Sequence, residues 1–332
     1  MRAIIPVAGP GTKLRPHTYS QPKALIPIAG KTVLGIIVEQ LYDAGITEFV
    51  FVVGHLGDKI EDYINQEYAH ITAHFVYQNL REGTAHAINI TKNFVANDEV
   101  FIVLGDTICE FDIKEIMALP YSTLGIKKVD DPTKFGIAEL NETDNETIVK
   151  LIEKPEIPTS NNALVGLYKI KETAELFNCL QLLTAQGAGA NGNFTITEAL
   201  QCMINQGITI KTFKVYNWYD CGNKDSLLES NAVLLKKFNL GFTQPITYEN
   251  TIIIPPVTIG NNCQISNAII GPNVAVGRNT IINKSIVSNA IIGSYTKLNN
   301  VVIENSFVGN DVLVNGLKRN LNIGDNTELN FG

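Results

Sequence analysis

The chain has 332 residues, of which 45% are apolar and 18% are charged, and its formal net charge is −7. This length predicts two domains with ample material for their cores. The negative charge and the lack of a long basic run exclude a nucleic-acid surface, and no apolar run approaches the length of a membrane span. We therefore expect a cytoplasmic protein that binds neither nucleic acid nor membrane.

The first predicted element is a buried strand from Ala3 to Val7, because this run is apolar and leads into a glycine-containing turn. Gly9 and Gly11 let the backbone turn tightly and bring amide N–H groups close to an anion. The segment predicts a phosphate loop, although it lacks the Gly-Lys-Ser/Thr ending of a Walker loop and one glycine of the dinucleotide fingerprint. The positive side chains that follow are Lys13, Arg15 and Lys23.

Strands and helices then alternate along the first two-thirds of the chain. Helical spacing of apolar residues covers 32–44 and 84–94, and strand-like runs cover 48–53, 75–77 and 100–104. This alternation predicts an α/β domain over residues 1–240, with a Rossmann-like, mixed but mostly parallel sheet. Ligands of such sheets bind outside the carboxyl ends of the strands. The phosphate loop, Gln78 and Asp106 all fall just past such ends.

Residues 251–332 follow a different pattern, in which one aliphatic residue recurs every five or six positions. These residues are Ile259, Ile265, Ile270, Val276, Ile282, Val287, Ile292, Leu298, Ile303, Val308 and Val314. The period matches a hexapeptide solenoid, in which each flat side contributes one inward residue. Asparagine corners such as Asn261-Asn262 and Asn299-Asn300 suit a left-handed backbone conformation. We predict a left-handed parallel β-helix.

The cysteines are scattered, odd in number and without a Cys-x-x-Cys pair. They are Cys109, Cys179, Cys202, Cys221 and Cys263. This pattern predicts neither a disulfide framework nor a zinc site, and we expect buried, reduced side chains. The five histidines show no metal spacing and are expected in loops or on the surface.

The run from Ala8 to Pro16, Ala-Gly-Pro-Gly-Thr-Lys-Leu-Arg-Pro, is followed by Gln-Pro-Lys-Ala-Leu-Ile-Pro-Ile-Ala-Gly-Lys at residues 21–31. Together they resemble the signature of the sugar-phosphate nucleotidyltransferases, or NDP-sugar pyrophosphorylases, such as the glucose-1-phosphate thymidylyltransferases. Two features depart from that signature. Many members have one more glycine in the loop, and Lys13 stands where Arg is usual. Lysine keeps the charge but loses the bidentate fork.

The resemblance implies a catalytic role for four charged residues, which are Lys13, Lys23, Asp106 and Lys154. It also implies that Asp106 and Asp220 bind Mg²⁺, the ion that neutralises a triphosphate. Alone, an aspartate after a strand would be a turn or helix cap. Here two such residues match one long pattern.

Binding residues are implied by the same resemblance. The nucleotide would contact Ala8, Gly9, Gly11, Thr12, Gln78, Gly83 and Thr84, and the sugar would contact Gly136, Glu153 and Val165. A glutamine amide offers both a donor and an acceptor, which suits uracil or thymine and also guanine. The expected reaction joins a sugar 1-phosphate to an NTP, with dTTP and glucose 1-phosphate favoured and UTP or GTP as alternatives.

Two other functional classes stay open at this point. The solenoid is also a scaffold of acyltransferases, although residues 251–332 contain no histidine and only one evident insertion, at 315–320. A catalytically silent sugar-nucleotide sensor is the other alternative, favoured by Lys13 and opposed by the remaining motif residues. We expect the solenoid to join copies of the chain into a homo-oligomer, because its flat sides and open end are most readily buried against another copy.

Overall fold

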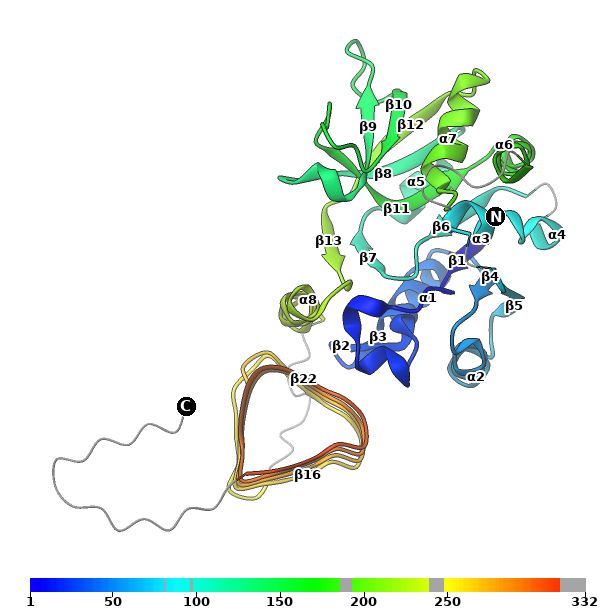
Figure 1. The fold of residues 1–332 in the computed structure, drawn as a ribbon. Coiled ribbons are helices and arrows are strands. Elements are labelled where there is room, and N and C mark those ends of the chain that lie inside the picture. Colours follow the sequence, from blue (N-terminus) through cyan, green and yellow to red (C-terminus); the bar gives the residue numbers. More distant parts are fainter. Residues whose placement is uncertain (81, 96–97, 186–192, 239–247, 317–332) are drawn as a thin grey trace. The chain divides into compact units, whose positions relative to one another are not determined.

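The computed structural model describes residues 1–332 except 81, 96–97, 186–192, 239–247 and 317–332, and it divides into two compact units, Met1–Ser230 and Asn231–Gly332 (Figure 1). Helix α8 (Lys224–Lys237) spans the division between the units. Among the described helices, none has both the length and the apolar character needed to cross a bilayer.

The first unit is built on a nine-stranded sheet, and the strands of one half of this sheet are parallel. Strands β6 (Val100–Val103), β1 (Arg2–Pro6), β4 (Glu48–Val53) and β5 (Thr72–Tyr77) lie in this order and run in the same direction. Their β-branched and aromatic runs are almost entirely buried in β1, β4 and β6, as expected of a parallel sheet covered on both faces. The predicted alternating domain is confirmed.

The other half of the sheet makes it mixed. Its strands are β8 (Ser122–Lys128), β9 (Gly136–Leu140), β10 (Ile148–Glu153), β11 (Asn162–Ile170) and β12 (Ile210–Lys214). Strand β11 runs antiparallel to β6, β8 and β9, whereas β12 is parallel to β8. The short hairpin β2 (Pro27–Ile28) and β3 (Lys31–Thr32) stands apart from this sheet.

The helices of this unit are α1 (Val33–Asp43), α2 (Gly57–Glu67), α3 (Thr84–Asn89), α4 (Lys92–Val95), α5 (Ile113–Ala118), α6 (Thr173–Ala185) and α7 (Ile196–Asn205). The helix expected over 84–94 is two helices instead. Thr91 lies between them and bonds its hydroxyl to the Ile88 carbonyl, a local bond that competes with the helical pattern. Helices α3, α6 and α7 contact one another and share one apolar core.

The cysteine prediction is wrong for one pair. Cys179 of α6 and Cys202 of α7 form a disulfide across the packed helices, with their Cα atoms 5.9 Å apart. Because the two residues are 23 positions apart, only the packing of the two helices brings them together. Cys109 and Cys221 are buried free thiols, as expected.

The second unit is a stack of short parallel strands in which successive coils pair in register (Figure 1). Val257 pairs with Val274 and Val274 with Ala290, so these coils are 17 and 16 residues long. The strands are β14 (Ile252–Ile253), β15 (Val257–Ile259), β16 (Gln264–Ser266), β17 (Ile269–Ile270), β18 (Val274–Val276), β19 (Ile281–Asn283), β20 (Ile286–Ile292), β21 (Lys297–Asn299), β22 (Val302–Val308) and β23 (Leu313–Asn315).

All eleven residues that the period predicted lie in or against one apolar core. That core also buries four residues that the period missed, which are Val257, Ala268, Val274 and Ala290. Asn262 and Asn300 have φ of +60° and +57°, which confirms the left-handed corners. The hand of the coil stays a prediction. Most of the insertion proposed at 315–320, and the last predicted coil, lie outside the described residues.

Candidate active site

The carboxyl ends of β1, β4, β5 and β6 share one edge of the sheet, because these strands are parallel. The segments that follow β1, β5 and β6, together with residues 153–154 and 193–195, surround a pocket of about 450 Å³. The predicted residues that line it are Ala8, Gly9, Lys23, Gln78, Gly83, Thr84, Asp106, Glu153 and Lys154. One cavity thus collects residues from the nucleotide, metal and sugar groups of the prediction.

The loop after β1 is packed too tightly for larger residues at its turn. Gly11 has φ of +62° and precedes the 3₁₀ helix η1 (Thr12–Leu14). A Cβ atom at Gly11 would lie 2.9 Å from the Lys23 Cβ, and the Thr18 hydroxyl donates to the Gly11 carbonyl at 2.8 Å. The glycine therefore lets the loop lie directly against the segment that carries Lys23.

Lys23 and Asp106 form an ion pair at the pocket. The Lys23 Nζ lies 2.6 Å from the Asp106 Oδ2, although the residues are 83 positions apart. Lys23 begins the 3₁₀ helix η3 (Lys23–Leu25), and Asp106 follows β6 after Gly105. A Cβ at Gly105 would lie 2.2 Å from the Val7 Cγ1, so this glycine allows the β6 and β1 loops to meet.

Asp220 reaches the same region through a separate two-stranded sheet. Strands β7 (Thr107–Glu110) and β13 (Asn217–Asp220) are antiparallel, and Asp220 lies opposite Thr107, the neighbour of Asp106. Burial first, and then the negative charges of Asp106 and Asp220, raise the pKa of the Cys221 thiol. The strand register thus brings Asp220 next to the residue that follows Asp106.

Asp106 and Asp220 are the type of residue that binds a magnesium ion together with the oxygens of a phosphate chain. Mg²⁺ is usually held by one or two carboxylates together with water and phosphate oxygens. The described part of the chain contains no cluster of three or more His, Cys, Asp or Glu side chains arranged to hold a metal. Two carboxylates from the chain would suffice for an ion that takes its remaining ligands from the substrate and from water.

Glu153 and Lys154 line the same pocket at the point where β10 ends. The Thr197 hydroxyl donates to the Glu153 Oε2 at 2.6 Å, and a Cβ at Gly136 would lie 3.1 Å from this oxygen. Lys154 has φ of +41°, and its amide donates to the Phe135 carbonyl at 3.1 Å. This uncommon backbone conformation occurs where the chain turns into the pocket.

Six predicted residues do not line this pocket, namely Gly11, Thr12, Lys13, Gly136, Val165 and Asp220. Lys13 is exposed on η1, and Val165 is buried in β11. Sequence reasoning missed Asn193, Phe194 and Thr195, which do line it. The sequence signal was present, because Thr195 and Glu198 form a capping box at the start of α7.

Hydrogen bonds hold Gln78, Gly83 and Thr84, the residues expected to contact the base. The Gln78 Nε2 lies 3.1 Å from both the Gly83 carbonyl and the His86 Nδ1. The Thr84 hydroxyl accepts a bond of 3.0 Å from the Ile196 amide of α7. The expectation that every histidine lies in a loop or on the surface is wrong for His86, because it lies on α3 and its side chain is only 18% exposed.

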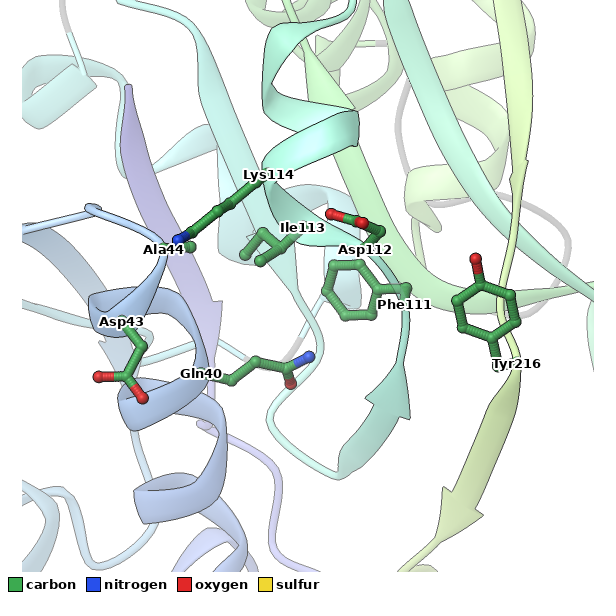
Figure 2. Close-up of a pocket in the computed structure, with 8 residues that line it drawn as sticks. All are labelled: Gln40, Asp43, Ala44, Phe111, Asp112, Ile113, Lys114 and Tyr216. Atoms are coloured by element: carbon green, nitrogen blue, oxygen red, sulfur yellow. The ribbon is translucent and has the colours of Figure 1, made fainter.

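A second pocket, of about 440 Å³, lies between the end of α1 and residues 111–114 (Figure 2). It is lined by Gln40, Asp43, Ala44, Phe111, Asp112, Ile113, Lys114 and Tyr216. Two carboxylates accompany its single lysine, and none of the predicted site residues lines it. We therefore place the chemistry in the first pocket.

Residues 2–237 match the nucleotidyl transferase family. The chain belongs to this family. It is 34% identical over 260 residues to the bifunctional protein GlmU of Methanocaldococcus jannaschii, with 78% of the chain and 60% of GlmU covered. It is 29% identical over 320 residues to a glucose-1-phosphate thymidylyltransferase of Streptomyces griseus, with 88% and 87% covered.

A solved structure of a UDP-glucose pyrophosphorylase complexed with UDP-glucose is also similar to this nucleotidyl transferase. The TM-score is 0.63 at 26% identity, and the match covers 71% of this chain and 98% of the other. The family and the fold class of the first unit are thus established together with the enzyme class, which is nucleotidyl transfer. The resemblance read from the N-terminal signature is confirmed.

Proposed function

We propose that this enzyme joins a sugar 1-phosphate to an NTP, most readily glucose 1-phosphate and dTTP, to give an NDP-sugar and pyrophosphate. The main support is the pocket that brings together the pair Lys23 and Asp106 and the pair Glu153 and Lys154. Positive groups for two phosphate-bearing substrates, with a carboxylate suited to hydroxyl groups, are what this reaction needs.

The step is an in-line displacement. An oxygen of the sugar 1-phosphate attacks the α-phosphorus, the new P–O bond forms, and the bond from the α-phosphorus to the bridging oxygen breaks as pyrophosphate leaves. Lys23 binds the α-phosphate, Lys154 the incoming phosphate, and Lys13 with the loop amides the β- and γ-phosphates. No covalent nucleophile is required, so catalysis consists of positioning and charge neutralisation.

Asp106 and Asp220 would hold Mg²⁺, which when bound neutralises charge on the phosphates. Glu153 binds sugar hydroxyls. Its Oε2 accepts the hydrogen bond from the Thr197 hydroxyl, which leaves its Oε1 to contact the sugar. Gly136 gives the sugar room beside that carboxylate. Gln78, with the backbone at Gly83 and Thr84, reads the base.

The preference for dTTP and glucose 1-phosphate is supported by the Streptomyces griseus relative, which is named a glucose-1-phosphate thymidylyltransferase and whose match extends over 88% of this chain. UTP is the nearest alternative, supported by the structural similarity to a UDP-glucose pyrophosphorylase. We further propose that the coils of the second unit are left-handed and join copies of the chain.

The test is a matrix of NTPs against sugar 1-phosphates in the presence of Mg²⁺, with pyrophosphate release as the readout. We expect the highest kcat/KM for dTTP with glucose 1-phosphate. A maximum at UTP or GTP would correct the base and leave the reaction class intact. Tight NDP-sugar binding without pyrophosphate release from any pair would replace the enzyme with a sensor of sugar nucleotides.

A bifunctional enzyme is tested in the same preparation. The similarity to GlmU, a protein named bifunctional, motivates this arm. Residues 251–332 contain no histidine to serve as a base, so we expect no acyl transfer. Consumption of acetyl-CoA in the presence of an amino-sugar phosphate would assign a second activity to the solenoid.

A further inference from the structure

The side chain of Gln78 is held from two directions within the pocket. Its residue is only 8% exposed, and its Nε2 lies 3.1 Å from the Gly83 carbonyl and 3.1 Å from the His86 Nδ1. A carbonyl oxygen can only accept, so the atom facing Gly83 must be the amide nitrogen. The orientation of this amide therefore follows from chemistry as well as from geometry.

The same contacts determine the tautomer of His86. Because the Gln78 nitrogen carries only donors, the His86 Nδ1 must accept, and the imidazole proton resides on Nε2. That Nε2 lies 3.8 Å from the Glu82 Oε2, and a carboxylate favours a proton on this side of the ring. Glu82, His86 and Gln78 therefore lie in series, from a Glu82 side chain that is 43% exposed to the buried amide of Gln78.

We propose that His86 is a positioning residue that sets base specificity by fixing the orientation of the Gln78 amide. Both hydrogens of Nε2 are directed to Gly83 and His86, so the amide presents its oxygen, an acceptor, to the nucleotide. This inference rests on the proposed function, in which Gln78 reads the base.

An acceptor that faces the ring nitrogen N3 of a pyrimidine, or N1 of a purine, selects bases that carry a hydrogen on that nitrogen. Thymine and uracil have a donor at N3 and guanine has one at N1, whereas cytosine N3 and adenine N1 are acceptors. A lone pair facing a lone pair leaves a buried polar group without its partner, which costs more than a mere absence of contact. The network therefore favours dTTP, UTP and GTP over CTP and ATP.

The loop itself does not need the His86 side chain. The Ala85 amide donates to the Phe194 carbonyl at 3.0 Å, and the Ala87 amide to the Gly83 carbonyl at 3.2 Å. A Cβ at Gly83 would lie 2.2 Å from the Phe194 carbonyl, so the backbone is closely held at this point. Replacing the imidazole is thus expected to change the orientation of the amide and to leave the backbone in place.

The experiment compares dTTP with 5-methyl-dCTP, which differ only at the base edge that the amide would meet. Affinities are measured by calorimetry and kcat/KM by pyrophosphate release, for the full chain and for His86→Phe and His86→Asn. Phenylalanine keeps a ring but removes the acceptor, whereas the Asn Oδ1 replaces Nδ1 as an acceptor. His74→Phe is the matched control, because His74 lies on β5 and packs against Phe94.

We expect His86→Phe to lower the preference for dTTP about tenfold, the value of one misdirected hydrogen bond. His86→Asn and His74→Phe should keep that preference. Unchanged selectivity in His86→Phe, or equal binding of the two nucleotides by the unmodified chain, would overturn the inference. If His86→Phe does not fold, the preference for dTTP over 5-methyl-dCTP is measured in Glu82→Gln instead. We expect a smaller decrease of this preference there. An unchanged preference in Glu82→Gln would refute the proposal.

Different results would refute the proposed reaction and the proposed role of His86. Selective binding of dTTP without pyrophosphate release from any sugar 1-phosphate would refute the proposed reaction and preserve the role of His86. Pyrophosphate release with unaltered base selectivity in His86→Phe would do the reverse.

Discussion

The two units of this protein use their residues in opposite ways. In the solenoid, one kind of residue repeats in register, so that Ile265, Ile282 and Leu298 stack in equivalent positions. In the catalytic unit, the pocket is lined by single residues from segments that are far apart in the sequence, such as Lys23, Asp106 and Glu153. Stability in the solenoid is therefore shared among equivalent contacts, whereas each pocket residue has a role that no neighbour repeats.

The largest expected effect tests this single-residue character. Asp106→Asn and Asp220→Asn should each lower kcat by about 1,000-fold, because each removes negative charge from the proposed Mg²⁺ site. Pyrophosphate release at varied Mg²⁺ concentration is the measurement. Asp225→Asn is the control, since its carboxylate is 86% exposed. Near-normal turnover in either variant removes that residue from the metal site.

The disulfide between Cys179 and Cys202 is a covalent contact of the catalytic unit that no neighbouring residue repeats. It closes a segment of 23 residues, and a loop of this size contributes about 3 kcal/mol to the free energy of unfolding. Denaturant unfolding with and without dithiothreitol should show this loss. The double variant Cys179→Ala, Cys202→Ala should be insensitive to the reductant. A full chain that is equally insensitive would mean that the pair is not bonded in solution.

Lys13 tests whether the exposed part of the phosphate loop contributes beyond its turn. Lys13→Ala should lower kcat/KM by about 30-fold, a charged hydrogen bond of roughly 2 kcal/mol, whereas Lys13→Arg keeps or raises it. Lys92→Ala, another exposed lysine, serves as the control. Unaltered kinetics in Lys13→Ala would reduce the loop to a structural turn.

Substitutions at an inward and an outward position test which side chains of the solenoid stabilise it. Ile282→Val should cost about 1 kcal/mol of unfolding free energy, because Ile282 is fully buried. Ile286→Val should cost much less, since Ile286 is 42% exposed. Chemical denaturation of the two variants measures the difference. Equal losses would contradict the assignment of inward and outward faces.

Removal of the solenoid should have the smallest effect on the chemistry. Truncation before Thr251 is expected to change the oligomeric state in light scattering and to leave nucleotidyl transfer largely in place, because the pocket residues all precede Ser230. Loss of all activity in a folded truncation would show that the two units act together. An unchanged mass relative to the monomer would refute assembly through the solenoid.

Much of this protein could be read from local pattern. Every residue that the period of five or six predicted lies in or against the core of the solenoid, because a repeat leaves few alternatives for which side chain faces inward. The same holds for the phosphate loop and for Gln78 and Asp106, which follow parallel strands and so had to share one edge of the sheet. Motif resemblance then supplied the family, which residues 2–237 confirm.

Other features depended on packing between distant segments. The disulfide required α6 and α7 to lie together, and the bond from Thr197 to Glu153 required α7 to begin beside the end of β10. The contact between Gln78 and His86 is the clearest case, since a histidine eight residues from Gln78 carries no local signal. The hydrogen-bond partners of such side chains are set only when separate elements bring their atoms within about 3 Å of each other, because a hydrogen bond is short-ranged and directional.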